Sequence, residues 1–166
     1  MNTLQTKRLT LCPITINESA FIFELLNTPD WIKFIGDRNI RTLADARDYI
    51  ADKLIKGYQE DGFGLLLVKL QNNEAPIGIC GLIKREALAD IDIGFAFLPQ
   101  FYGKGYAYEA AAATMDDARM NRGIKRIVAI TTEVNLRSIR LLEKIGLHFE
   151  KRFYMEGDPE ELLLYS

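Results

Sequence analysis

The sequence has little of what several protein classes require. Two cysteines and one histidine among 166 residues make a poor metal-ligand set and no disulfide framework. Basic and acidic residues nearly balance, 21 against 23, so the positive excess of nucleic-acid-binding proteins is missing. No apolar run approaches the roughly 20 residues of a membrane span, and MNTLQTKRLTL lacks the apolar core of a signal peptide. We therefore expect a cytoplasmic protein with no metal and with no nucleic-acid or membrane partner.

What is present favours a globular protein, because 48% of the residues are hydrophobic and can form a core. Cys12 and Cys80 lie in apolar runs and are predicted to be buried, reduced thiols. His148 alternates with apolar residues in a predicted strand, which favours a structural role. The basic pair Lys84-Arg85 is predicted to be solvated surface.

Hydrophobic periodicity and turn residues divide the chain into strands and helices. The predicted strands are 8–14, 63–70, 77–83, 90–99, 126–132, 147–155 and 160–166. The predicted helices are 17–27, 42–59, 105–121 and 135–146, with Asn17, Thr42 and Asn135 as N-caps. The segment 28–41, with Pro29 and Gly36, is predicted to be irregular. This order predicts one α/β (α+β) domain over 1–166, in which about four helices flank a mixed, mostly antiparallel twisted sheet of six to seven strands.

The junction between strand 90–99 and helix 105–121 reads QFYGKGY (100–106). A helix start has unpaired backbone N–H groups and a partial positive charge, and both attract phosphate. Gly103 and Gly105 lack the β-carbons that would keep an anion away from the backbone, and Lys104 adds a mobile cation. The junction is typical of a pyrophosphate-binding loop, although a tight turn without a ligand fits these residues as well.

Three phosphate-binding motifs compete for this junction. A Walker loop needs Ser or Thr where Gly105 stands. A dinucleotide-binding loop needs a third small residue where Tyr108 stands. Gln100, Gly103 and Gly105 fill the third motif, Gln-x-x-Gly-x-Gly.

With this loop the sequence resembles the GNAT superfamily of N-acetyltransferases, in which the motif binds the pyrophosphate of acetyl-coenzyme A. Four stretches are similar to the subgroup that contains the ribosomal-protein alanine and serine N-acetyltransferases: 6–14, 28–50, 94–110 and 135–147. The resemblance extends over nearly the whole chain. It implies the GNAT fold and acetyl-coenzyme A (acetyl-CoA) as cosubstrate.

The resemblance also implies which residues contact the cofactor: Phe97, Leu98, Gln100, Gly103, Lys104, Gly105, Tyr106 and Asn135. The backbone of Phe97 and Leu98 is expected to hold the pantetheine amides by strand-like hydrogen bonds. One of these two N–H groups is expected to stabilise the oxyanion of the reaction. Asn135, already a predicted N-cap, is expected to contact the pantetheine arm or the adenosine side.

Asp92 is the candidate general base, because related enzymes often carry a catalytic Glu at this strand position. Its shorter side chain is expected to act through a water molecule. Strand alternation places Asp92 on one face with Asp90 and Gly94. A solvent-facing structural carboxylate explains Asp92 nearly as well. Glu109 is a second candidate, which a place on the helix surface explains as easily.

A general acid for the leaving thiolate is less evident. Many GNAT members supply a Tyr where Leu142 stands in this sequence. A thiol with a pKa of about 8.5 is a tolerable leaving group without such an acid. Ser138, one helical turn before Leu142, is the candidate to assist, although a polar residue in a first helical turn needs no catalytic role.

The acceptor is expected between 31–38 and 156–161. Three aromatic residues are predicted to form an apolar wall there: Trp31, Phe34 and Tyr154. Five acidic residues are predicted to attract a cationic amine: Asp37, Glu156, Asp158, Glu160 and Glu161. An α-amino group with a pKa of about 8 is neutral at pH 7 more often than a lysine with a pKa of about 10.4. A protein or peptide N-terminal α-amine is therefore the first prediction for the acceptor.

The sequence thus predicts an acetyl-CoA-dependent N-acetyltransferase, as a monomer or homodimer, in which a primary amine attacks directly within a ternary complex. A non-catalytic acyl-CoA-sensing module stays open because Leu142 replaces the usual acid. A nucleotide-binding protein that uses the same loop and acetylation of a small-molecule amine such as a polyamine also stay open.

Overall fold

A computed structural model of the protein describes residues 2–166, and its sheet has the strand order β1-β2-β3-β4-β5-β6-β8-β7. The strands are β1 (Leu4–Gln5), β2 (Leu9–Pro13), β3 (Leu65–Leu70), β4 (Pro76–Ile83), β5 (Ile91–Phe97), β6 (Ile127–Thr131), β7 (Phe149–Tyr154) and β8 (Glu161–Tyr165). Neighbouring strands are antiparallel except for β5 and β6, which are parallel. The predicted mixed sheet is confirmed, and the short β1 is one strand more than expected.

The helices are α1 (Ser19–Leu26), α2 (Pro29–Phe34), α3 (Leu43–Tyr49), α4 (Lys56–Asp61), α5 (Tyr106–Met120) and α6 (Leu136–Lys144). A π-helical segment, η2 (Ile50–Ile55), joins α3 to α4, and two 3₁₀ turns are η1 (Ile16–Glu18) and η3 (Pro99–Phe101). The chain from α3 to α4 was expected as one regular helix. A π segment widens the helical turn, and such segments are frequent at functional sites. None of these helices has the length and hydropathy of a membrane-spanning segment.

The helix caps confirm part of the prediction and correct part of it. Thr42 and Asn135 are N-caps as expected. Asn17 is not a cap, because the capping box is formed by Thr15 and Glu18 at the start of η1. The segment 28–41 is not wholly irregular, since the Thr28 hydroxyl accepts the Trp31 N–H and starts α2 with a proline in its first turn.

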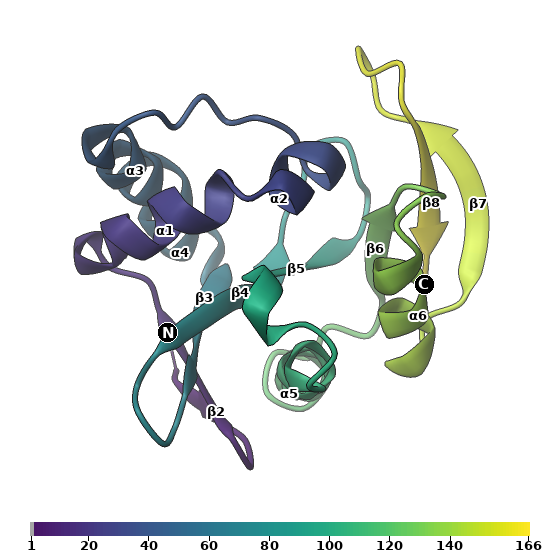
Figure 1. The fold of residues 1–166 in the computed structure, drawn as a ribbon. Coiled ribbons are helices and arrows are strands. Elements are labelled where there is room, and N and C mark those ends of the chain that lie inside the picture. The colour runs from purple at the N-terminus through teal and green to yellow at the C-terminus, as the bar shows by residue number, and fades with distance from the viewer. Residues whose placement is uncertain (1) are drawn as a thin grey trace.

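Helices cover both faces of the sheet (Figure 1). On one face α5 and α6 pack small and apolar side chains against the strands, among them Ala110, Ala111, Met115 and Leu142. On the other face α1, α2, α3 and η2 pack a second cluster that includes Ile22, Leu25, Trp31 and Ile50. Cys80 is buried in the first cluster and Cys12 is half-buried, and both thiols are free.

The pairing between β5 and β6 is short. Within residues 2–166 the two strands pair at Ile91 with Ile127 and at Asp92 with Val128, and at no later position. Beyond these pairs β5 continues along β4 as far as Phe97, while β6 continues along β8. The two halves of the sheet therefore part on the carboxyl side of Asp92.

The close approach of β3 and β4 gives a stability prediction. A β-carbon on Gly81 would lie 2.1 Å from the Gly64 carbonyl oxygen, and a backbone atom cannot swing aside. Gly81→Ala is therefore expected to lower the free energy of unfolding by about 1–3 kcal/mol. Gly57→Ala, at a position in α4 with nothing within 4 Å, should raise it by about 0.4–1 kcal/mol. Urea unfolding followed by circular dichroism measures both, and a Gly81→Ala protein as stable as wild type would contradict this strand packing.

Candidate active site

A cavity of about 790 Å³ lies where β5 and β6 part. Its walls come from α2, the α3–η2–α4 segment, β5, β6, the loop after β5 and α6. Seven of the predicted site residues line it: Asp92, Phe97, Gly103, Gly105, Tyr106, Asn135 and Ser138. Leu98, Gln100 and Lys104 do not line it. The cavity thus brings the predicted cofactor loop and the predicted catalytic residues together.

The edge of β5 that faces the cavity has hydrogen-bonding groups without a strand partner. The Leu98 N–H donates to the Ile77 carbonyl oxygen at 2.9 Å, on the β4 side. Successive N–H groups of a strand point to opposite edges, so the Phe97 N–H faces the side from which β6 has departed. The Phe97 N–H is therefore available to a ligand, whereas that of Leu98 is engaged and does not suit the role expected of it.

The glycine loop has a backbone conformation that favours glycine. Gly103 and Gly105 adopt positive φ angles of 73° and 80°, in the left-handed region that favours glycine. Gly105 is the N-cap of α5, and no side chain accepts from the first N–H groups of this 15-residue helix. Gln100 and Lys104 are exposed, and the Lys104 ammonium lies 5.5 Å from the centroid of the Phe101 ring. The backbone of the loop, more than its polar side chains, faces the cavity.

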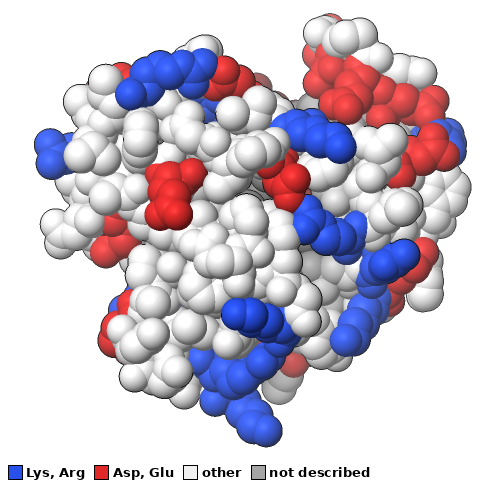
Figure 2. All heavy atoms as spheres, in the orientation of Figure 1, with Lys and Arg blue, Asp and Glu red and all other residues white. Residues whose placement is uncertain are grey.

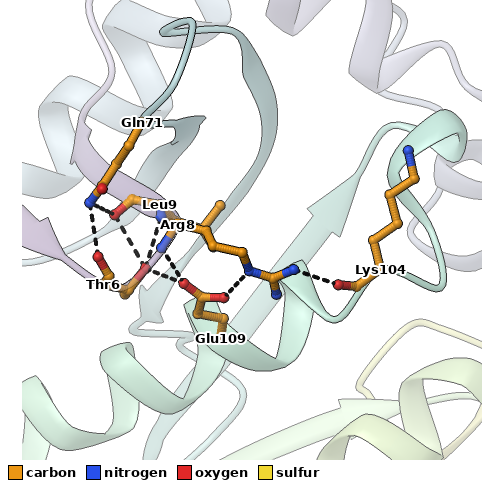
Figure 3. A network of polar contacts seen from close by, with 6 residues as sticks. All are labelled: Thr6, Arg8, Leu9, Gln71, Lys104 and Glu109. Carbon is orange, nitrogen blue, oxygen red and sulfur yellow. Dashed lines mark hydrogen bonds and ion pairs between the residues drawn. The ribbon is translucent and has the colours of Figure 1, made fainter.

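A network of hydrogen bonds from the N-terminal arm (residues 6–9) holds this loop in place (Figure 3). The Arg8 guanidinium donates to the Lys104 carbonyl oxygen at 3.0 Å and to the Glu109 carboxylate at 2.7 Å. The Arg8 N–H and the Thr6 hydroxyl donate to the other oxygen of Glu109. Gln71 in turn donates to the carbonyl oxygens of Thr6 and Leu9. The arm and the first turn of α5 are thereby held in one arrangement.

This network removes Glu109 as a candidate base. Burial raises the pKa of its carboxyl, but the Thr6 hydroxyl and the Arg8 contacts outweigh that effect and hold the pKa below its usual value. Glu109 also lies outside the cavity lining. A carboxylate that accepts several hydrogen bonds from fixed donors is a structural group.

Asp92 is in a different environment. Its side chain is only 1% exposed, so it is not the solvent-facing carboxylate that the sequence also allowed. One carboxylate oxygen accepts from Arg85 Nε at 2.6 Å, and the other, Oδ1, is buried with no hydrogen-bond partner among residues 2–166. Burial raises the pKa of Asp92 to about 6, although the Arg85 guanidinium and the backbone N–H of Ile130 oppose the shift. A carboxylate of this kind is ionised at pH 7 and is more basic than an ordinary one.

The residues expected near the leaving group lie together on α6. Ser138 lines the cavity, and its N–H donates to Asn135 Oδ1 at 3.2 Å, which orients the first turn of the helix. Leu142 also lines the cavity and is buried. The position of the usual acid therefore presents a methyl-bearing side chain to the cavity.

Sequence reasoning missed two arginines. Arg8 was treated as part of a strand and Arg85 as solvated surface. Arg85 instead pairs with a buried carboxylate, and its side chain is 33% exposed. The signal that could have revealed the Arg85–Asp92 pair was the register of the β4–β5 hairpin. Ile83 lies opposite Asp92 in this hairpin, so Arg85, two residues after Ile83, is close enough to pair with Asp92.

Of the residues expected on the acceptor side, only some line the cavity. Trp31 and Phe34 line the cavity, but Tyr154 is exposed and does not. The five acidic residues expected to attract the amine do not line it either. Asp37 pairs with Arg41, and the other four lie around the β7–β8 turn, whose projecting tip carries the acidic group at the upper right of Figure 2.

Unpartnered polar atoms test whether the cavity suits a large polar ligand. Three buried polar atoms without a hydrogen-bond partner belong to residues that line it: Trp31 Nε1, Asp92 Oδ1 and Thr131 Oγ1. Such groups destabilise a folded protein unless a ligand or water satisfies them. Together with the free Phe97 N–H and the uncapped start of α5, they fit a ligand that carries amides at one end and phosphates at the other.

Comparisons with known proteins point to the same ligand. The family model of the acetyltransferase (GNAT) domain matches residues 8–148. The uncharacterized N-acetyltransferase YnaD of Bacillus subtilis (strain 168) is 27% identical over 150 residues, which cover 90% of this chain and 85% of that protein. A solved acetyltransferase from Agrobacterium tumefaciens str. C58 has a TM-score of 0.84 at 25% identity, with 99% and 93% of the two chains covered. A ribosomal L7/L12 α-N-protein acetyltransferase in complex with coenzyme A has a similar fold, with a TM-score of 0.80 at 17% identity and coverage of 99% and 96%.

The matched residues 8–148 include Arg8, the glycine loop, Asp92 and α6, so the family match covers the cavity and not only the sheet. The predicted fold is confirmed by these likenesses, and they do not favour the nucleotide-binding alternative for the loop. The chain belongs to the GNAT family of acetyltransferases, whose cosubstrate is acetyl-CoA.

Proposed function

We propose that the protein acetylates a primary amine that enters between α2 and the α3–η2–α4 segment, and that Asp92 is the general base. One observation carries this proposal: a buried carboxylate with an unpartnered oxygen lines the same cavity as the free backbone groups of the glycine loop. Our first choice of acceptor is a protein or peptide N-terminal α-amine. The fold likeness to an α-N-protein acetyltransferase supports this choice.

Each residue on the acetyl-CoA side of the cavity is matched to a part of acetyl-CoA by the hydrogen-bonding groups that it offers. The N–H groups around Gly103, Gly105 and Tyr106 suit the pyrophosphate. The Phe97 N–H suits a pantetheine amide or the carbonyl oxygen of the acetyl group. Asn135 borders the pantetheine path from the start of α6. Gln100 and Lys104, which are exposed beside the loop, act on the phosphates from outside the cavity.

The reaction needs a neutral amine and an acceptor for its proton. The amine nitrogen attacks the thioester carbonyl carbon, the carbon–sulfur bond breaks, the sulfur leaves as a thiolate, and the amine proton passes to Asp92 through a water molecule. The Phe97 N–H donates to the carbonyl oxygen as negative charge develops there. We assign the Ser138 hydroxyl as the hydrogen-bond donor that assists the leaving thiolate, since the side chain of Leu142 has no proton to donate.

A sensing module that binds acyl-CoA without turnover is the second candidate, favoured by Leu142. Thiol release from acetyl-CoA, measured with a panel of peptides, lysine-like amines and polyamines, separates the two functions. Acetyl-CoA binding together with thiol release for at least one acceptor is expected. Binding with no release for any acceptor would favour the module.

The glycine loop gives a binding prediction with a matched control. Gly103 and Gly123 both have positive φ angles and open space around the β-carbon position, but only Gly103 lines the cavity. Gly103→Val should therefore weaken acetyl-CoA binding strongly, because the side chain would occupy the phosphate position. Gly123→Val should carry similar backbone strain and leave the acetyl-CoA dissociation constant unchanged. Calorimetric titration measures both constants, and equal constants for the two variants would show that the loop is only a turn.

Asp92 gives a prediction of pH dependence. Turnover by the wild type should rise as pH increases through about 6, because Asp92 accepts a proton only after losing its own. Asp92→Asn should keep acetyl-CoA affinity, lower turnover at pH 7 by about 10²-fold, and lose the inflection near pH 6 while keeping the rise that comes from deprotonation of the amine itself. The deficit should shrink at high pH and should be smaller for α-amines than for lysine-like amines, because amines that are already neutral need no base.

Asp90→Asn is the control for this substitution. Asp90 lies two residues earlier, pairs with Arg126, and does not line the cavity. Its variant should keep the wild-type pH profile. Wild-type turnover by Asp92→Asn at pH 7 would remove Asp92 from the mechanism and leave proton transfer to bulk water.

A further inference from the structure

The acceptor half of the cavity carries more positive than negative charge once its ion pairs are set aside. Asp30 of α2 lines this half and pairs with Arg137 of α6. The other basic lining residues are Arg38, Lys53, Lys56, Lys84 and Arg85, and the other acidic ones are Asp52, Glu60, Asp61 and Asp92. Three pairs form between them: Lys56 with Glu60, Lys84 with Asp61, and Arg85 with Asp92. The remaining charges are Arg38, Lys53 and Asp52. This half of the cavity is therefore not the anionic environment that a simple cation would need.

Arg38 stands out among the remaining charges. It follows α2, lines the cavity, and forms no ion pair or hydrogen bond with any residue of 2–166 in the structure. Burial raises the pKa of the Tyr49 hydroxyl, and the positive charges of Arg38 and Arg85 oppose the shift. Arg38, Arg85 and Tyr49 all line the cavity, and Tyr49 is the last residue of α3 before the π-helical segment.

Trp31 adds an independent observation. Its side chain is 5% exposed and lines the cavity, and its indole N–H is buried without an acceptor. An indole nitrogen is only a donor, so a hydrogen-bond acceptor from a ligand would satisfy it. The guanidinium of Arg38, the hydroxyl of Tyr49 and the indole of Trp31 are all hydrogen-bond donors.

We propose that the acceptor carries an anionic oxygen group, a carboxylate or a phosphate, close to the amine that is acetylated, and that Arg38, Tyr49 and Trp31 bind this group. A guanidinium matches both kinds of anion by paired hydrogen bonds. The proposal rests on the proposed function, since Asp92 receives the proton of the same acceptor's amine. For a protein N-terminus it means an acidic or phosphorylated residue directly after the first one.

Four amidated hexapeptides test this class of acceptor. They begin with Ala and differ at the second residue, which is Glu, phosphoserine, Gln or Lys, so the reacting amine stays chemically similar. The Glu peptide, the phosphoserine peptide or both should exceed the Gln peptide at least tenfold in kcat/KM, mainly through KM. The Lys peptide should be the poorest. Comparison of the two anionic peptides distinguishes carboxylate from phosphate.

Arg38→Gln should reduce the preference over the Gln peptide to less than twofold, mainly by raising KM for the anionic peptides, while the acetyl-CoA dissociation constant stays unchanged. Arg47→Gln is the control, since Arg47 is an exposed arginine of α3 outside the cavity lining. It should keep the full preference. Equal kcat/KM for the Glu, phosphoserine and Gln peptides, or an equal loss for all of them in Arg38→Gln, would overturn the proposal.

Binding without turnover keeps the two proposals separate. The probes are 3-acetamidopropanoate and its neutral carboxamide, added to the protein saturated with coenzyme A and followed by calorimetry. The carboxylate should bind at least tenfold more tightly than the carboxamide, and Arg38→Gln should abolish the difference. If no peptide is acetylated but this difference is found, the proposed function fails and the anion site stands. If the two probes bind equally, the anion site fails whatever the turnover.

Discussion

The divergence of β5 and β6 is the constraint on which the rest of the site depends. The two strands pair through Asp92 and Val128 and then separate, yet each keeps its antiparallel neighbour, β5 through Phe97 with Gly78 and β6 through Thr131 with Leu163. The separation therefore leaves free only the edges that face each other. A buried edge of this kind destabilises the fold unless its donors and acceptors find partners, and an extended amide-bearing ligand can supply them. The cavity, the free Phe97 N–H and the position of Asp92 at the last pair all follow from this divergence.

The second requirement is that the loop after β5 keeps one conformation. Two glycines at positive φ angles give it little intrinsic preference, and the chain before it ends in a single 3₁₀ turn. Arg8 supplies the missing constraint from a point 101 residues away from Glu109 in the sequence. The side chain of Arg8 is 42% exposed, so solvent screens its ion pair and the contribution of the pair to stability is modest. Its importance is geometric, because it fixes the Lys104 carbonyl and thereby the peptide plane that leads to Gly105.

Local signals in the sequence were sufficient for the fold. Alternation predicted the strands, and Thr42 and Asn135 capped their helices as predicted. Contacts that depend on tertiary register were not predictable from local patterns. The sequence allowed Asp92 to be either a solvent-facing carboxylate or a catalytic base. The structure shows that its side chain is buried and that the register of the β4–β5 hairpin brings Arg85 beside it. The acidic residues around 156–161 were placed near the acceptor by resemblance, but they project on a turn away from the cavity lining.

The charges around Asp92 constrain the acceptor further. An amine that arrives as a cation is attracted to Asp92, but Arg85 already neutralises one oxygen of that carboxylate, and Arg38 also lines the cavity. A polyamine would bring several positive charges into a wall whose unpaired charges are two basic and one acidic, and like charges repel at close range. An acceptor with an anionic group beside its amine meets the opposite situation, since its anionic group is attracted by the unpaired basic side chains of the cavity wall. The same arrangement favours a neutral amine near the base, because the surrounding arginines disfavour the protonated form and lower the pKa of an amine that comes close to them. Recognition of an anion and activation of the amine are thus two effects of one set of charges.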